Sequence, residues 1–210
     1  MKNIKNIIFD LDGTLWDSRQ QIANAWNEIL LPKLNITMNI DMITKLMGKT
    51  NDEIKNLAFK NIPINESDNL IKQCEQQEIK YISRNGANIY KNTINTLIEL
   101  SKNHNVYIVS NCQCGYIEAF LKYYNMNNLI VDYECNGNTK LSKTQNIKLI
   151  IDRNHLSRKS CCYIGDTFSD YEAAQNNNIN FIYAKYGFGN LSNQHNQIND
   201  ISELINYFNK

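Results

Sequence analysis

The stretch Ile7-Ile8-Phe9-Asp10-Leu11-Asp12-Gly13-Thr14-Leu15 places two acids at the end of an apolar run near the N-terminus. The run has the composition of a buried strand. Asp10 and Asp12 are two residues apart, so in an extended chain their side chains point to the same side. Gly13 lets the backbone turn sharply, and Thr14 adds a hydroxyl and an amide beyond the turn. Two acids this close repel each other unless a cation or a proton compensates, and oxygen ligands favour Mg²⁺. The stretch therefore predicts a magnesium site.

The composition is that of one globular domain, or of a domain with a smaller insertion. The chain has 210 residues, of which 42% are hydrophobic and 20% charged, values compatible with a packed core. The formal net charge of +1 gives no electrostatic reason to expect a nucleic acid or an acidic membrane as a partner. No cationic segment followed by an apolar stretch opens the chain, and no run reaches membrane-spanning length. We therefore expect a cytoplasmic protein.

The six cysteines do not show the spacing of a zinc site. Cys112-Gln-Cys114 and Cys161-Cys162 are the close pairs, and neither has the gap of about two to four residues that is typical of zinc ligands. We expect buried, reduced thiols. A redox role for Cys112 or Cys114 stays open, because both border the expected site.

Apolar periodicity divides the chain into two parts. From about Ser18 to Gly86 the spacing is helical, with a first helix ending at Pro32 and a third ending before Pro63. Beyond this part, apolar strands alternate with helices, which predicts right-handed crossovers and a parallel sheet. We expect an α/β fold: a doubly wound parallel sheet formed by residues 1–16 and 89–210, with an all-helical domain, residues 17–88, inserted. The strands are expected at 4–10, 106–110, 129–131, 161–164 and 181–183, and the alternating helices at 93–102, 115–124, 143–153, 169–177 and 201–208.

Polar residues follow three of the expected strands. Asp10, Ser110 and Asp166 each stand where a strand ends. Because ligands bind at the carboxyl ends of the strands in open parallel sheets, we expect these side chains in one site. The pair Ser110-Asn111 offers a hydroxyl and backbone amides that can bind a phosphoryl oxygen. Asp170 lies about one turn after Asp166 near a helix start, where an acid also compensates the helix dipole.

Four motifs, in this order along the chain, resemble those of the haloacid dehalogenase (HAD) superfamily of phosphohydrolases. They are Ile-Phe-Asp-Leu-Asp-Gly-Thr at 8–14, Ser110 after an apolar strand, Lys143 before a helix, and Gly-Asp-Thr-Phe-Ser-Asp at 165–170. Lys140 is the alternative for the third motif, and the Pro that commonly follows this lysine in the family is absent. The chain looks most similar to the phosphoglycolate-phosphatase-like branch. The resemblance implies a HAD-like Rossmannoid core with an inserted helical cap.

The resemblance also implies a magnesium-dependent phosphatase that hydrolyses a small phosphate monoester through an aspartyl-phosphate. Asp10 would attack phosphorus, while Asp12 would protonate the leaving alcohol and later deprotonate the hydrolytic water. Ser110 and Lys143 would hold the phosphoryl oxygens. The other expected contacts are Mg²⁺ with the carboxylates of Asp10, Asp166 and Asp170 and the backbone carbonyl of Asp12, and substrate with Thr14, Asn111, Gly48 and Lys49.

Two alternatives stay open, and a third is disfavoured. A hexose-phosphate mutase shares every core motif of the family. A non-catalytic binding or regulatory protein would have no physical reason to retain mutually repelling carboxylates. Asp12 argues against a dehalogenase, because that branch resembles the first motif without the second acid. As a partner we expect a small phosphorylated metabolite, with no nucleic acid and no membrane, and we expect a monomer or a weak homodimer.

Overall fold

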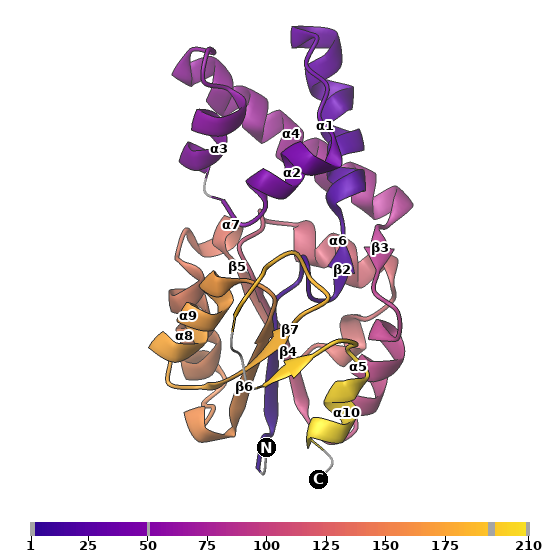
Figure 1. Cartoon of the computed structure of the whole chain (residues 1–210), viewed down its shortest axis with the longest axis vertical. Helices are drawn as coiled ribbons and strands as arrows, with labels where there is room; N and C mark the ends of the chain where they lie inside the picture. The colour runs from indigo at the N-terminus through magenta and orange to yellow at the C-terminus, as the bar shows by residue number, and fades with distance from the viewer. Residues whose placement is uncertain (1–2, 50, 193–195, 209–210) are drawn as a thin grey trace. The chain divides into compact units, whose positions relative to one another are not determined.

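The chain forms two compact units in a computed structural model that describes residues 3–49, 51–192 and 196–208. Unit 1 comprises Met1–Asp17, Asn88–Ile117 and Asn125–Lys210, and unit 2 comprises Ser18–Ala87 and Glu118–Tyr124 (Figure 1). The chain leaves unit 1 after β2 (Trp16–Asp17) and returns at β3 (Asn88–Ile89). These two strands pair antiparallel, with Asp17 opposite Asn88, so the point of exit and the point of return are neighbours.

Unit 1 contains a six-stranded sheet in the order β5-β4-β1-β6-β7-β8, with every neighbouring pair parallel. The strands are β1 (Asn6–Phe9), β4 (Asn105–Ser110), β5 (Asp132–Cys135), β6 (Cys161–Gly165), β7 (Asn180–Ala184) and β8 (Gln197–Ile198). The chain adds β4 and β5 on one side of β1 and then β6, β7 and β8 on the other. The winding therefore reverses at β1, and the predicted α/β class with a doubly wound parallel sheet is confirmed. Ligands bind beside such a reversal point, at the carboxyl ends of the strands.

Helices cover both faces of this sheet. Strand side chains alternate between the faces, and those on one face pack with α8 (Lys143–Arg153) and α9 (Phe168–Asn176). Figure 1 shows α5 (Thr93–Ser101) and α10 (Glu203–Phe208) on the opposite side of the sheet from α8 and α9. The core under α8 and α9 includes Ile8, Val109, Tyr163, Ile147, Ile150, Ala173 and Ala174. The central strands end at the same level, because Phe9, the last residue of β1, pairs with both Ile108 and Ile164.

Unit 2 is helical. Its helices are α1 (Arg19–Leu34), α2 (Ile40–Leu46), α3 (Asn51–Ala58), α4 (Ile64–Asn85) and most of α6 (Tyr116–Tyr123). Apolar side chains spaced at three and four residues meet in a separate core, where Trp26 stacks on Phe59 with ring centroids 6.1 Å apart. Among the described residues, no helix is both long enough and apolar enough to cross a bilayer.

Several expected boundaries differ from the structure, and two of them have a clear physical reason. The first helix continues past Pro32 to Leu34, because a proline in the last turn removes a single hydrogen bond before the left-handed Asn35 ends the helix. Residues 127–129 form a 3₁₀ turn, and the strand begins only at Asp132. The apolar run 129–131 was ambiguous, since a short apolar run does not distinguish a strand from a turn that packs on the core. The short elements β2, β3, β8 and α7 (Asn136–Thr139) had no periodic signal to predict them.

Candidate active site

The loop after β1 brings the first motif against the fourth. Asp10 follows β1 directly, and its backbone N–H donates to the carbonyl of Ile164 in β6 at 2.9 Å. Gly13 has φ +86°, and a Cβ there would lie 2.3 Å from Asp166 Oδ2. No other residue type fits this position, because a side chain would displace the acid of the fourth motif. The Thr14 hydroxyl donates to Asp166 Oδ1 at 3.3 Å, which joins the two motifs a second time.

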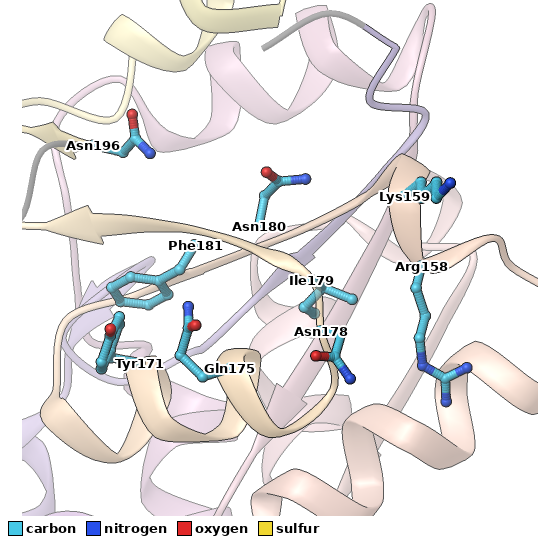
Figure 2. Close-up of a pocket in the computed structure, with 9 residues that line it drawn as sticks. All are labelled: Arg158, Lys159, Tyr171, Gln175, Asn178, Ile179, Asn180, Phe181 and Asn196. Atoms are coloured by element: carbon cyan, nitrogen blue, oxygen red, sulfur yellow. The ribbon is translucent and has the colours of Figure 1, made fainter.

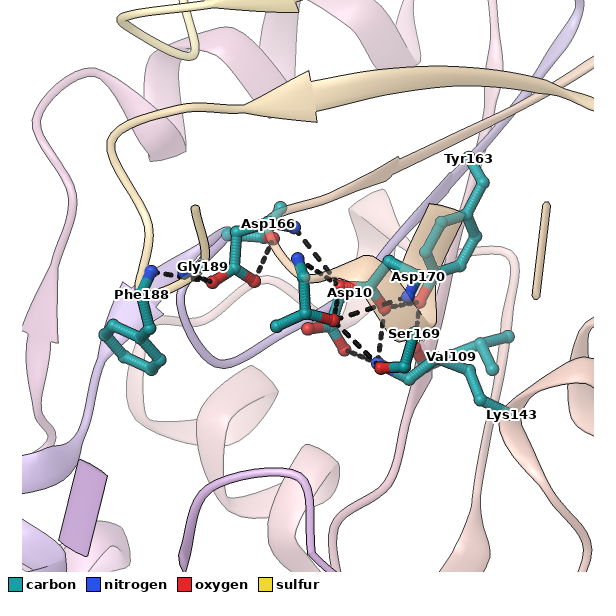
Figure 3. Close-up of polar contacts among 11 residues, drawn as sticks. Asp10, Val109, Lys143, Tyr163, Asp166, Ser169, Asp170, Phe188 and Gly189 are labelled. Carbon is teal, nitrogen blue, oxygen red and sulfur yellow. Dashed lines mark hydrogen bonds and ion pairs between the residues drawn. The ribbon is translucent and has the colours of Figure 1, made fainter. Parts of the chain in front are cut away.

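Three buried carboxylates meet at this edge of the sheet. Asp10, Asp166 and Asp170 each offer an oxygen within 4.8 Å of the others (Figure 3). Asp10 and Asp166 come from the ends of adjacent strands, and Asp170 comes from the first turn of α9. The structure therefore brings together the three carboxylates that the motifs single out. Asp12 lies outside this cluster, and the contribution expected of it was a backbone carbonyl.

Lys143 is placed between two of these acids. Its Nζ donates to Asp10 Oδ1 at 2.9 Å and to Asp170 Oδ1 at 2.6 Å, as Figure 3 shows. It is the first residue of α8, which Ser142 caps by accepting from the backbone N–H of Gln145. The alternative, Lys140, is exposed and donates to the carbonyl of Gly137. Of the two lysines, the fold delivers Lys143 to the carboxylates.

Asp170 serves the helix and the lysine at once. Its Oδ2 accepts from the backbone N–H groups of Asp166 and Thr167 and from the Thr167 hydroxyl, which closes a capping box at the start of α9. Its Oδ1 accepts from Lys143 and, at 3.4 Å, from the Tyr163 hydroxyl. The capping role considered from the sequence is therefore present, together with a second role of holding Lys143.

Burial makes the charges of this cluster costly. Burial raises the pKa of Asp10 well above its ordinary value, against the opposing effect of Lys143, and the charges of Asp170 and Asp166 raise it further. Burial and the Asp170 charge raise the pKa of Asp166 to about 7. Burial alone would lower the pKa of Lys143, but the charges of Asp10 and Asp170 outweigh it and raise that pKa. Three carboxylates against one ammonium leave a formal charge of −2. An all-oxygen donor set with this charge fits Mg²⁺.

A pH and metal dependence of stability follows from Asp166. Its pKa is raised on folding, so its contribution to stability is fully present below about pH 4 and is lost as the pH rises through about 7. In EDTA we expect the melting temperature to fall between pH 5 and pH 8, by roughly 3–6 °C for a chain of this size. Mg²⁺ should reverse this fall at pH 8 and act weakly at pH 5, where protons compete for the carboxylates. Thermal unfolding with and without Mg²⁺ measures both effects, and Asp166→Asn should remove them. A melting temperature that rises with pH in EDTA would contradict the assignment.

The remaining candidates from the sequence are divided between the two units. Ser110 is the buried last residue of β4, beside β1 at the same edge of the sheet, and Asn111 follows it half-buried. Gly48 and Lys49 belong to unit 2 and are exposed. The Lys49 ammonium pairs with Glu53 at 3.2 Å, and both side chains are more than 40% exposed. Such a pair contributes little to stability.

A loop after β7 completes the surroundings of Asp166, and the sequence analysis did not identify it. The backbone N–H groups of Phe188 and Gly189 donate to Asp166 Oδ2 at 2.7 and 3.3 Å. A Cβ on Gly187 would lie 2.3 Å from Asp166 Cβ and 2.4 Å from the carbonyl oxygen of Gly13. The available signal was the Gly-Phe-Gly spacing, which begins three residues after the last residue of β7, because glycine permits such close backbone approach.

We expect Gly187→Ala to weaken Mg²⁺ binding by about 10- to 100-fold, the usual range when the support of a metal ligand is lost. The added methyl group would overlap Asp166 and displace its carboxylate from its present position in the cluster. Titration of the melting temperature with Mg²⁺ measures the change. The matched control is Asn190→Ala, an exposed position in the same loop, which should bind Mg²⁺ like the parent chain. Unchanged binding by the Gly187 variant would show that the loop is dispensable.

None of the six cysteines, all of which lie in the described part of the chain, forms a disulfide bond. Burial raises the pKa of the Cys112 thiol well above its ordinary value, so this sulfur stays protonated and weakly nucleophilic. Cys114 is exposed, and Cys74, Cys135, Cys161 and Cys162 are buried.

A separate surface hollow of about 580 Å³ lies elsewhere on unit 1 (Figure 2). Its lining includes Arg158, Lys159, Asn178 and Asn180, which stand at or just before the starts of β6 and β7. The hollow therefore lies toward the amino ends of these strands, whereas the carboxylates gather at the carboxyl ends. We assign no part of the chemistry to it.

Known proteins share both the sequence pattern and the fold. A sequence model of the family described as "Haloacid dehalogenase-like hydrolase" matches residues 7–184. The phosphoglycolate phosphatase of Aliivibrio fischeri is 23% identical over 197 residues, which cover 89% of this chain and 86% of that protein. A haloacid dehalogenase-like hydrolase from Streptococcus pneumoniae superposes with a TM-score of 0.83 at 21% identity, over 98% of each chain. A predicted phosphoglycolate phosphatase from Haemophilus somnus gives a TM-score of 0.81 at 20% identity, over 99% of each chain. At these identities the structural likeness shows a common fold.

Proposed function

Because the chain belongs to the haloacid dehalogenase-like hydrolase family, we propose that it is a magnesium-dependent phosphatase acting through an aspartyl-phosphate on Asp10. The family membership confirms the expected enzyme class, a hydrolase of this superfamily. One observation supports the metal requirement and the nucleophile: a buried lysine bridges Asp10 and Asp170 inside a carboxylate cluster that keeps an excess of negative charge. A phosphate ester can approach an anionic nucleophile only where cations offset this charge, and the cluster is built to hold them.

The residues divide the reaction into two steps. A carboxylate oxygen of Asp10 forms a bond to phosphorus while the bond from phosphorus to the leaving oxygen breaks, and Asp12 gives that oxygen a proton. Asp12 then takes a proton from water, whose oxygen bonds to phosphorus while the bond from phosphorus to Asp10 breaks, which releases inorganic phosphate and restores the Asp10 carboxylate. Lys143 orients Asp10 and, with Ser110, holds phosphoryl oxygens. Mg²⁺, held by Asp10, Asp166 and Asp170 with the Asp12 backbone carbonyl, would neutralise charge on the phosphoryl group.

We assign the substrate to the class of small phosphate monoesters, with phosphoglycolate as the first candidate. The support is the sequence similarity to the phosphoglycolate phosphatase of Aliivibrio fischeri. In this proposal unit 2 is a cap that closes over the substrate and excludes water. Gly48 and Lys49 are its candidate substrate contacts, with the Lys49 ammonium meeting a second anionic group such as a carboxylate.

The test is phosphate release from a panel of phosphoglycolate, sugar phosphates and nucleoside monophosphates, with Mg²⁺ and with EDTA. We expect hydrolysis with Mg²⁺ and a loss of at least about 100-fold in EDTA, because the uncompensated carboxylates repel the ester. Undiminished activity in EDTA would refute the metal requirement. Sustained phosphate transfer to a sugar phosphate without release of inorganic phosphate would replace the proposal with a mutase. No reaction with any ester would favour a binding protein.

A further inference from the structure

Two aromatic side chains hold the carboxyl group of Asp12. The indole Nε1–H of Trp16 donates to Asp12 Oδ1 at 2.8 Å, and the phenol O–H of Tyr116 donates to the same oxygen at 3.0 Å. Trp16 lies four residues after Asp12 in β2, whereas Tyr116 begins α6, beyond the second motif. Donors from two distant parts of the sequence therefore converge on a single atom.

Both donors are rigidly placed. Trp16 and Tyr116 are 0% and 1% exposed, and their rings meet edge to face with centroids 5.6 Å apart. The backbone of Trp16 pairs with Ile89 in β3, and its carbonyl accepts from Gly13 at 2.9 Å. An aspartate side chain has two rotatable bonds, so two hydrogen bonds from fixed donors restrict it to one orientation.

We propose that Trp16 and Tyr116 are positioning residues that orient the Asp12 carboxyl for proton transfer. This inference rests on the proposed function, in which Asp12 is the general acid and base. Since Oδ1 already accepts two hydrogens, the transferable proton resides on Oδ2, and the two donors select which oxygen faces the leaving group. As the ester bond breaks, the Oδ2–H bond breaks and its proton joins the leaving oxygen. Asp12 is then a carboxylate that still accepts both hydrogen bonds.

A packing role alone predicts a different outcome. A buried indole N–H or phenol O–H needs an acceptor, so these contacts would exist even if they did nothing for catalysis. Their loss would then reduce stability and lower activity on every ester by the same factor. A positioning role makes the loss depend on the leaving group, because only a poor leaving group needs the proton from Asp12.

The experiment compares two esters in Tyr116→Phe and Trp16→Phe. Glycerol phosphate releases an alkoxide that must be protonated, whereas p-nitrophenyl phosphate releases a stable phenolate. The value of kcat/KM reports the steps from substrate binding up to and including cleavage of the substrate ester, and excludes the later hydrolysis of the aspartyl-phosphate. We expect both variants to lose about 10- to 100-fold in kcat/KM on glycerol phosphate and less than about 3-fold on p-nitrophenyl phosphate. The control is Tyr207→Phe. The Tyr207 hydroxyl donates to the Gln197 carbonyl at 3.1 Å, and its removal should leave the ratio of kcat/KM on the two esters unchanged.

A double variant distinguishes a loss of activity that acts through Asp12 from a loss caused by reduced stability. With Asp12→Asn already in place, Tyr116→Phe should cost no more than about 2-fold further, because residues acting through one group are not additive. Equal losses on both esters, or a full further loss in the double variant, would overturn the inference while leaving the proposed function intact. A parent chain that hydrolyses neither ester would overturn the proposed function and the inference together.

Discussion

Asp10→Asn should abolish phosphate release, with a loss of at least about 10⁴-fold in kcat. An amide oxygen of the same shape cannot act as the nucleophile, and removal of a covalent nucleophile costs losses of this order. The fold should be retained, because the substitution removes one of three mutually repelling acids and leaves Lys143 paired with Asp170. Phosphate release under saturating ester and Mg²⁺ measures the first effect, and thermal unfolding in EDTA measures the second.

The matched control for this variant is Asp152→Asn. Asp152 is an exposed acid on α8 that pairs with Lys148, so its change removes a carboxylate without touching the cluster. We expect it to keep the activity of the parent chain. Substantial phosphatase activity in Asp10→Asn would refute the nucleophile assignment, and a full loss in Asp152→Asn would show that the assay reports folding.

Lys143→Met should produce the second large effect, on activity and on stability together. The Lys143 side chain is 9% exposed and its ammonium contacts Asp10 and Asp170, so its removal leaves two buried carboxylates without their cation. Breaking a buried ion pair from one side costs about 3–5 kcal/mol. We expect a free energy of unfolding lower by about that amount in EDTA, and a loss of roughly 10²- to 10³-fold in kcat/KM, in line with the loss of one charge-stabilising contact.

Two comparisons sharpen this prediction. Lys140→Met changes an exposed lysine three residues earlier and should leave both quantities near those of the parent chain, which tests the choice between the two lysines. Lower pH should restore part of the lost stability of Lys143→Met, because protonation neutralises Asp10, whose pKa burial raises on folding. If Lys140→Met carried the large loss and Lys143→Met did not, the third motif would be assigned to Lys140.

The strand ends and the order of the motifs could be predicted because they depend on local pattern. Apolar runs such as 6–9 and 161–165 are buried on both faces of a parallel sheet, so they read as continuous hydrophobic segments that stop at a polar residue. Once the strands are parallel and wound in two directions, Asp10, Ser110 and Asp166 must share one edge. The helix at 143–153 could likewise be predicted from the spacing of its apolar residues.

Contacts between distant residues were beyond this kind of prediction. The amides of Phe188 and Gly189 reach Asp166 only because β7 lies beside β6, and the Gly-Phe-Gly spacing permits a close approach without naming Asp166 as the partner. The hydrogen bond from Tyr116 to Asp12 likewise requires α6 to begin beside the first motif. The sequence favoured Lys143 over Lys140 for the third motif, and the contacts of the Lys143 ammonium with Asp10 and Asp170 depend on where α8 starts.

The chain's pattern of apolar runs and acids was therefore sufficient for the class of fold and for the edge of the sheet where Asp10, Asp166 and Asp170 meet, since periodicity and strand ends are local properties. The partner of each acid depended on the packed three-dimensional arrangement. Burial converts nearby charges into strong interactions, and burial arises only when β1, β6, α8 and α9 close on one another. The pairing of Lys143 with Asp10 and Asp170, and the hydrogen bond from Tyr116 to Asp12, therefore depend on the tertiary structure.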